Sequence, residues 1–480
     1  MAFNSIDFAV FLPLVFLLYW FVFQKNLKTQ NYLLVFASCL FYGWWNWMFL
    51  GLICLSTAAS FILGLGISQA STESVRRFYL ILGAVLNLGV LGFFKYYNFF
   101  IYNVLMGFSL MGVEIDMEPL KIILPVGISF FTFQSLSYLF DVYRRHIVPT
   151  KDPVAFFAFV AFFPQLVAGP IERAKNLLPQ MTNRRHFNAA SATDGMRLIL
   201  WGLFKKVVVA DNCAILVNQI FEAPDSLNGA ALLLGAFFFS FQIYGDFSGY
   251  SDMAIGFARL FGFDLMRNFA FPYFSENIAE FWKKWHISLS TWFRDYVYIP
   301  LGGNRKGKTT TIRNVFIVFL ISGLWHGANW TFLAWGIVHA LLFLPYFLGQ
   351  SSNHSMNKNT LVSYSLRMAL NIGFTFFLTT LAWVFFRSDN IAQAWIIFER
   401  IFSPSLFSIP NLPNLPAAAL PLVMILLLLT IEWIGRNRQH ALEVLGTSWA
   451  APGRWALYCF ILSCIYFFGG PKQGFIYFQF

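Results

Sequence analysis

Charged side chains are scarce in this chain. Of its 480 residues, 33 are Lys or Arg and 22 are Asp or Glu, so 11% are charged, whereas soluble domains average about 25%. The hydrophobic fraction is 58%. This composition excludes an ordinary soluble domain and indicates an integral membrane protein. Basic loops on one side of a membrane explain the net charge of +11, which does not imply a nucleic-acid partner.

Cysteine is also rare, and its pattern argues against a metalloprotein. The five cysteines lie within or beside apolar runs and show no metal-ligand spacing. We therefore predict no metal site. We interpret these residues as small hydrophobic side chains: Cys39, Cys54, Cys213, Cys459 and Cys464.

Long apolar runs are abundant, for example residues 6–23, 49–67, 122–139 and 315–344. By length they predict about ten to twelve membrane spans. Because backbone polar groups in lipid must pair internally, continuous runs of this kind favour helices. We expect an all-α, polytopic helix bundle that forms one domain over residues 1–480. Residues 1–7 lack the features of a signal peptide, so the first run is expected to stay in the mature protein.

Several apolar regions are interrupted. The stretch at 79–112 contains Lys95 and fits either one long helix or two spans. Pro125, Pro164 and Pro170 fall inside or against apolar sequence, and broken backbone at membrane depth needs a protein or cavity cover. These interruptions predict a pocket or funnel. Residues 276–310 are basic and aromatic, which predicts a surface or interfacial helix on the cytoplasmic side.

His326 is the first candidate for chemistry, because an ionisable side chain in an apolar run is costly and rare. It is flanked by Trp325, Gly327 and Asn329. Imidazole can take a proton from a hydroxyl near neutral pH, so we favour a functional role over a packed histidine. His339 follows 13 residues later, which on a continuous helix is about 140° away. We interpret His339 as structural.

The basic segment holds a second histidine, His286. On a helix Lys283 would be its neighbour and would disfavour its protonation. A solvated basic face is as good an explanation of His286 as function. The cations of this region suit either anionic lipid headgroups or a phosphate-bearing donor, and composition does not decide between them. The cations singled out here are Lys283, Lys284 and Arg305.

Two carboxylates, Asp246 and Asp252, lie in a further apolar stretch. Unpaired carboxylates are expensive there and normally face the interior of the bundle. We predict that both support the bundle around a site, because a proton relay would need further aligned acids.

Five long motifs occur along the chain. In order, they are LPVGISFFTFQSLSY (124–138), AGPIERA (168–174), YGDFSGYSDMAIG (244–256), FWKKWHISLSTWFRDYVYIPLGGNR (281–305) and LWHGANW (324–330). Together they resemble the membrane-bound O-acyltransferase family, in its branch that O-acetylates alginate-type exopolysaccharides. The resemblance covers most of the chain.

This resemblance implies a bundle with re-entrant or interfacial helices around a thinned central catalytic funnel. It implies that His326 and His286 are the catalytic residues. The donor would be acetyl-coenzyme A or another acyl thioester that enters from the cytoplasm against Lys283, Lys284 and Arg305, with no tightly bound cofactor. The acceptor would be an extracytoplasmic polysaccharide, reached with the help of an extracytoplasmic acetyltransferase, and the location a bacterial inner membrane.

Two other functions also fit a polytopic basic protein. A transporter or flippase of a lipid-linked sugar would suit an embedded histidine, but such proteins usually show inverted repeats, which are not visible here. A structural scaffold in a polysaccharide synthase would need no embedded histidine.

Overall fold

The computed structural model describes residues 1–167, 169–348, 366–412 and 414–478, and within these ranges its regular elements are all helices. The predicted all-helical class is confirmed. The chain forms two compact units. The first unit comprises Met1–Ile199 and Ser251–Met266, and the second comprises Leu200–Tyr250 and Arg267–Phe480. The single-domain organisation stays a prediction.

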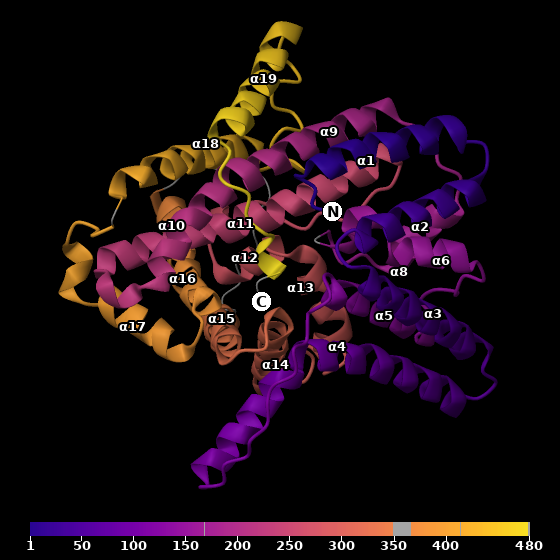
Figure 1. Ribbon diagram of the computed structural model, residues 1–480, viewed down its shortest axis with the longest axis horizontal. Helices are drawn as coiled ribbons and strands as arrows, with labels where there is room; N and C mark the ends of the chain where they lie inside the picture. Colours follow the sequence, from indigo (N-terminus) through magenta and orange to yellow (C-terminus); the bar gives the residue numbers. More distant parts are fainter. Residues whose placement is uncertain (168, 349–365, 413, 479–480) are drawn as a thin grey trace. The chain divides into compact units, whose positions relative to one another are not determined.

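The first unit is built on a group of three helices, α3, α4 and α5, that pack against one another (Figure 1). Glycines allow the close approach: a Cβ at Gly64 would lie 2.4 Å from the Tyr138 ring, and one at Gly83 would lie 2.6 Å from Leu139. The helices are α1 (Ile6–Leu17), α2 (Leu27–Gly43), α3 (Trp47–Gln69), α4 (Glu73–Leu110), α5 (Ile128–Tyr143), α6 (Pro153–Val160), α7 (Phe163–Leu166), α8 (Ala174–Thr182) and most of α9 (Ala189–Leu203).

The second unit contains the histidines of interest. Its π-helical turns are Phe204–Ala210 and Arg294–Tyr298. Its helices are α10 (Asp211–Glu222), most of α11 (Gly229–Leu260), α12 (Ile278–Lys284), α13 (Ile287–Phe293), α14 (Lys308–His326), α15 (Trp330–Leu348), α16 (Leu366–Arg387), α17 (Ile391–Ile401), α18 (Ala419–Gly435) and α19 (Ala451–Phe468).

Among the described residues, six helices are long and apolar enough to cross a membrane, and three shorter apolar helices accompany them. This is fewer than the ten to twelve spans that run length predicts. The difference arises because several apolar runs form short or interrupted helices: the run at 315–344 is divided between α14 and α15, and the run at 122–139 enters α5 only at Ile128. The six are α3, α4, α11, α16, α19 and residues 415–435 with α18. The interrupted stretch around Lys95 is one helix, α4, of 38 residues.

The apolar run at 315–344 is not one helix. Its helix α14 ends at His326, and Gly327 takes an extended conformation with φ −163° and ψ 154°. A Cβ at Gly327 would lie 2.0 Å from the Phe332 ring, so only glycine fits this break. The chain turns back here, and α14 and α15 pack against each other.

The expectation of one surface helix over 276–310 is wrong. Helix α12 ends at Lys284, and α13 begins only after His286, which has a left-handed φ of 44°. This conformation is uncommon for a residue with a side chain. The break carries Trp285 and His286 into the interior, where both are buried.

Candidate active site

The structure brings His286 and His326 together. Their ring centroids lie 6.4 Å apart, and the two residues are 0% and 3% exposed. His326 is the last residue of α14, and His286 precedes the first residue of α13. Both side chains therefore project from helix ends that the sequence breaks, rather than from the faces of continuous helices.

Asn268 fixes the position of His286 through the start of α13. Its carbonyl accepts a hydrogen bond from the Ile287 amide at 2.9 Å. Its side-chain oxygen accepts from the Ser288 hydroxyl at 2.9 Å and from the Ser288 amide at 3.3 Å. Asn268 is itself fully buried, so the loop that carries His286 is held by bonds that water does not weaken.

Aromatic rings surround the histidine pair. Trp325 contacts both histidines, with centroids 5.6 Å from His286 and 4.9 Å from His326. Four further rings, one from each of four different segments, lie closest to the pair. They are Phe247 of α11 at 4.6 Å from His286, and Trp335 of α15, Phe386 of α16 and Tyr477 near the C-terminus at 5.1, 5.2 and 5.6 Å from His326.

Burial lowers the pKa of His286 to about 3, because the low-dielectric surroundings disfavour the imidazolium form. The sequence predicts the same direction but attributes it to Lys283, and this attribution is wrong. Lys283 is exposed at the end of α12, and desolvation is the cause. His286 is therefore neutral at physiological pH, with one ring nitrogen that donates and one that accepts.

Asp246 supports this site through a buried ion cluster. Lys206 forms ion pairs of 2.8 Å with both Asp246 and Asp211, and all three residues are buried. Asp246 also accepts a hydrogen bond of 2.6 Å from the amide of Ile476. Lys206 donates to the Gln473 carbonyl at 3.3 Å. The cluster thus fixes the segment that places Tyr477 beside His326.

Lys206 and Tyr477 are site residues that the sequence analysis missed. The signals were weak: two lysines inside the apolar run FKKVVVA, and an aromatic end that follows the sequence Gly-Gly-Pro. Asp246 lies 230 residues from Ile476, and nothing local in the sequence indicates that these two segments meet.

The other candidates from the sequence lie outside the ring-lined histidine pair. Asn329 serves the turn after His326: its amide donates to the Asp389 carbonyl at 2.7 Å, and its oxygen accepts from the Thr331 amide at 3.1 Å. Asp252 belongs to the first unit, where it is half-buried. Lys283 and Arg305 are exposed, whereas Lys284 forms an ion pair of 2.7 Å with Glu280. A donor site formed by these cations stays a prediction.

The geometric argument about His339 is wrong, because the helix is broken between it and His326. The ring of Trp335 lies 5.1 Å from His326 and 4.8 Å from His339, so it contacts both. His339 accepts a hydrogen bond from the Trp282 indole at 3.3 Å. The Trp335 ring therefore lies between His339 and His326. Within the residues that the structure describes, no group of His, Cys, Asp and Glu side chains is placed to hold a metal ion.

These features define a class: a multi-pass helical membrane protein with two histidines buried among aromatic rings. The sequence model of the membrane-bound O-acyltransferase family matches residues 85–387, and the chain belongs to this family. It is an O-acyltransferase.

Three curated relatives illustrate the range of the similarity. The probable alginate O-acetylase AlgI of Pseudomonas aeruginosa is 42% identical over 410 residues, which are 84% of this chain and 75% of the relative. The peptidoglycan O-acetyltransferase of Helicobacter pylori is 34% identical over 517 aligned residues, with 98% and 95% covered. The teichoic acid D-alanyltransferase of Bacillus subtilis is 29% identical over 240 residues, with 48% and 60% covered.

Proposed function

We propose that this chain takes an acetyl group from a cytoplasmic acyl thioester, with acetyl-coenzyme A as the donor, and passes it across the membrane for O-acylation of an extracytoplasmic polysaccharide. The observation that carries the proposal is the buried histidine pair, in a chain of the O-acyltransferase family. Two of the relatives described above are named as a probable alginate O-acetylase and a peptidoglycan O-acetyltransferase. Higher identity to the alginate enzyme favours an alginate-like acceptor.

The chemistry needs one base and a dry site. In our proposal His326 removes the proton of an acceptor hydroxyl, the oxygen attacks the thioester carbonyl, and the carbon–sulfur bond breaks. The ester forms, and the departing thiolate takes up the proton that His326 received. A positioned general base contributes about a hundred- to ten-thousandfold in rate. Neutral His286 would orient a reacting group by hydrogen bonding.

The aromatic lining explains why the pair lies so deep. Excluding water strengthens each hydrogen bond within the site and protects the thioester from hydrolysis. Among the described residues, six helices are long and apolar enough to cross a membrane, and we propose that this membrane is a bacterial inner membrane. An extracytoplasmic acetyltransferase is the proposed partner that completes delivery to the polysaccharide.

The test compares a deletion strain with the same strain carrying the gene. We expect deletion to lower the number of ester-linked acetyl groups per sugar and to leave the amount of exported polysaccharide unchanged. A lipid-linked-sugar transporter predicts the reverse, with less polysaccharide and unchanged acetyl content. Labelled acetyl-coenzyme A, supplied to the cytoplasmic face of isolated membranes, tests the donor. Failure of label to reach the polysaccharide would reject that donor.

A further inference from the structure

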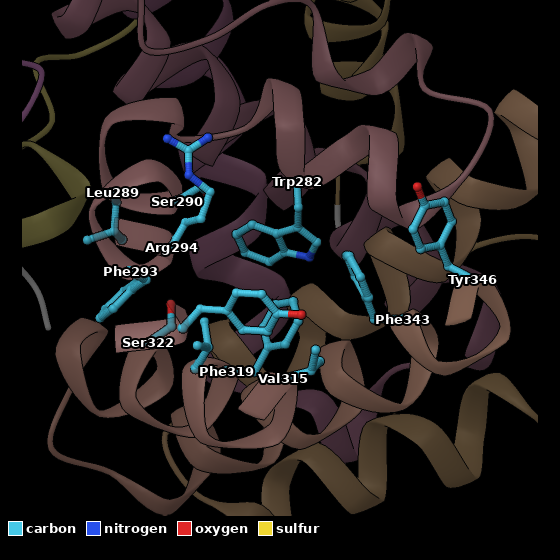
Figure 2. A pocket seen from close by; sticks show the side chains of 12 residues that line it. Trp282, Leu289, Ser290, Phe293, Arg294, Val315, Phe319, Ser322, Phe343 and Tyr346 are labelled. Atoms are coloured by element: carbon cyan, nitrogen blue, oxygen red, sulfur yellow. The ribbon is translucent and has the colours of Figure 1, made fainter. Parts of the chain in front are cut away.

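The second unit contains an apolar cavity of about 260 Å³ that is lined by residues of α12, α13, α14 and α15 and of the π-helical turn at 294–298. Aromatic rings form its centre: Figure 2 shows Trp282, Phe319 and Phe343 gathered there, with the Arg294 guanidinium directed away from them. Arg294 has a side chain that is 59% exposed, so the cavity reaches the surface at this residue.

The size of the cavity exceeds what an acetyl group needs. An apolar cavity of about 150 Å³ is enough to hold a benzene molecule, and this one is larger. A two-carbon acyl group would leave most of it empty. Water is not stable among apolar walls of this kind, so a hydrocarbon of several carbons is the better occupant.

The lining distinguishes an alkyl chain from the pantetheine arm of a thioester. That arm carries two amides, and burying an amide without a hydrogen-bond partner is costly. Four hydroxyl-bearing residues line the cavity, namely Ser290, Tyr298, Ser322 and Tyr346, and the Ser290 hydroxyl already donates to the Trp285 carbonyl at 3.2 Å. An alkyl chain needs no such partners and buries its surface against the rings.

Positive charge lies where the cavity opens. Arg294 forms an ion pair of 2.8 Å with Asp295 through Nε; this pair offsets part of its charge, but the guanidinium carries further donors that suit phosphate. Tyr298 lines the cavity, and the turn that follows it is fixed to Tyr298 by a hydrogen bond of 2.9 Å, which the Gly303 amide donates to the Tyr298 carbonyl. This turn and the start of α14 add exposed cations: Arg305, Lys306 and Lys308.

We infer that this cavity binds one alkyl chain of an anionic membrane phospholipid, whose phosphate lies against Arg294 and the basic turn. The bound lipid fills the space between α12, α14 and α15, and so supports the Trp282 ring that donates to His339. Arg305 belongs both to this turn and to the predicted donor cations, so the test of the lipid site uses Arg294 and two cavity residues, Val318 and Ser322, on which the acyl-transfer proposal does not depend.

Photo-crosslinking tests the site directly. The probe is phosphatidylglycerol with a photoreactive group in one acyl chain, doped into phosphatidylcholine nanodiscs that contain the full chain. We expect crosslinks on the peptides that line the cavity, around Trp282 and Phe319. Val318→Phe and, separately, Ser322→Leu should remove most of this labelling by filling the cavity. Arg294→Gln should lower the preference for the anionic probe over a phosphatidylcholine probe by about fivefold.

Val423→Phe is the matched control, because Val423 is an exposed valine on α18 and its replacement should leave cavity labelling unchanged. Variants are compared only as monodisperse proteins. Labelling that survives both filling variants would overturn the proposal, because it would report surface lipid alone. Labelling abolished by excess acetyl-coenzyme A would also overturn it and would assign the cavity to the donor arm.

Discussion

Helices α11 and α19 have nearly the same mean hydropathy, yet 78% of the apolar window of α11 is buried and only 11% of that of α19. Helix α19 exposes large side chains such as Trp455, Tyr466 and Phe467. Helix α11 carries buried polar residues, among them Gln242 and Asp246. Hydropathy therefore indicates that a helix can enter a membrane, whereas its polar residues indicate that it faces protein, because only protein can satisfy them there.

The largest effect should come from breaking the ion cluster that Asp246 of α11 forms with Lys206 and Asp211. Lys206→Met leaves Asp246 and Asp211 buried without their shared cation. Removing one partner of a buried ion pair costs about 3–5 kcal/mol. The midpoint temperature of thermal unfolding in detergent should therefore fall strongly. The double variant Lys206→Met with Asp246→Asn should recover part of the loss. Equal stability of Lys206→Met and the wild type would show that the cluster does not hold the C-terminal segment.

Removing one tyrosine hydroxyl from α11 should lower the stability by a smaller amount, and removing one from α19 should not change it. Tyr244 of α11 donates to Glu432 of α18 at 2.8 and 2.9 Å in the buried interior, so Tyr244→Phe should cost about 1–3 kcal/mol. Tyr466 of α19 is 83% exposed, and Tyr466→Phe should be silent in the same unfolding assay. Equal losses in the two variants would break the contrast between these helices.

Substitution of His339 tests whether a change behind the Trp335 ring affects the catalytic site at His326. Because Trp335 contacts both His339 and His326, His339→Ala should displace the wall of the site and lower acyl transfer by roughly tenfold. His339→Gln keeps a hydrogen-bond acceptor for Trp282 and should recover part of that activity. Full activity in His339→Ala would mean that the Trp335 ring keeps its position without the contact from His339.

The smallest effects should come from exposed cations. Reversal at Lys283 or Arg305 should weaken the apparent affinity for acetyl-coenzyme A by about fivefold each, the effect of one unscreened surface charge. Lys284→Glu should have less effect, because its partner Glu280 already neutralises it. Titration in nanodiscs at two salt concentrations measures this. Donor affinity unchanged in Lys283→Glu and Arg305→Glu would leave lipid contact as their role.

The sequence analysis predicted the membrane class and the helical fold, and it singled out the two histidines that the structure brings together. It did so because a buried histidine is costly enough to be noticed in an apolar run, and because the motifs around both histidines resemble a known family. Local properties of this kind are visible in a linear sequence. They do not depend on which segments meet.

The arrangement of the site could not be predicted. The break at Gly327 depends on the Phe332 ring, which leaves no space for a side chain. The left-handed His286 is held by Asn268, and Tyr477 is placed by Asp246 from 230 residues away through Ile476. Each of these features is a tertiary contact that overrides local preference. Periodicity consequently gave the wrong relation between His326 and His339.

The most direct test of the account is acyl transfer by His326→Ala. We expect acetylation of the exopolysaccharide to fall by about a hundred- to ten-thousandfold, at a normal level of folded, membrane-inserted protein, and His286→Ala to impair transfer as well. His186→Ala, which removes an exposed histidine, is the matched control and should acetylate like the wild type. Acetylation by His326→Ala at the level of that control would contradict the assignment of the buried histidine pair as the catalytic centre.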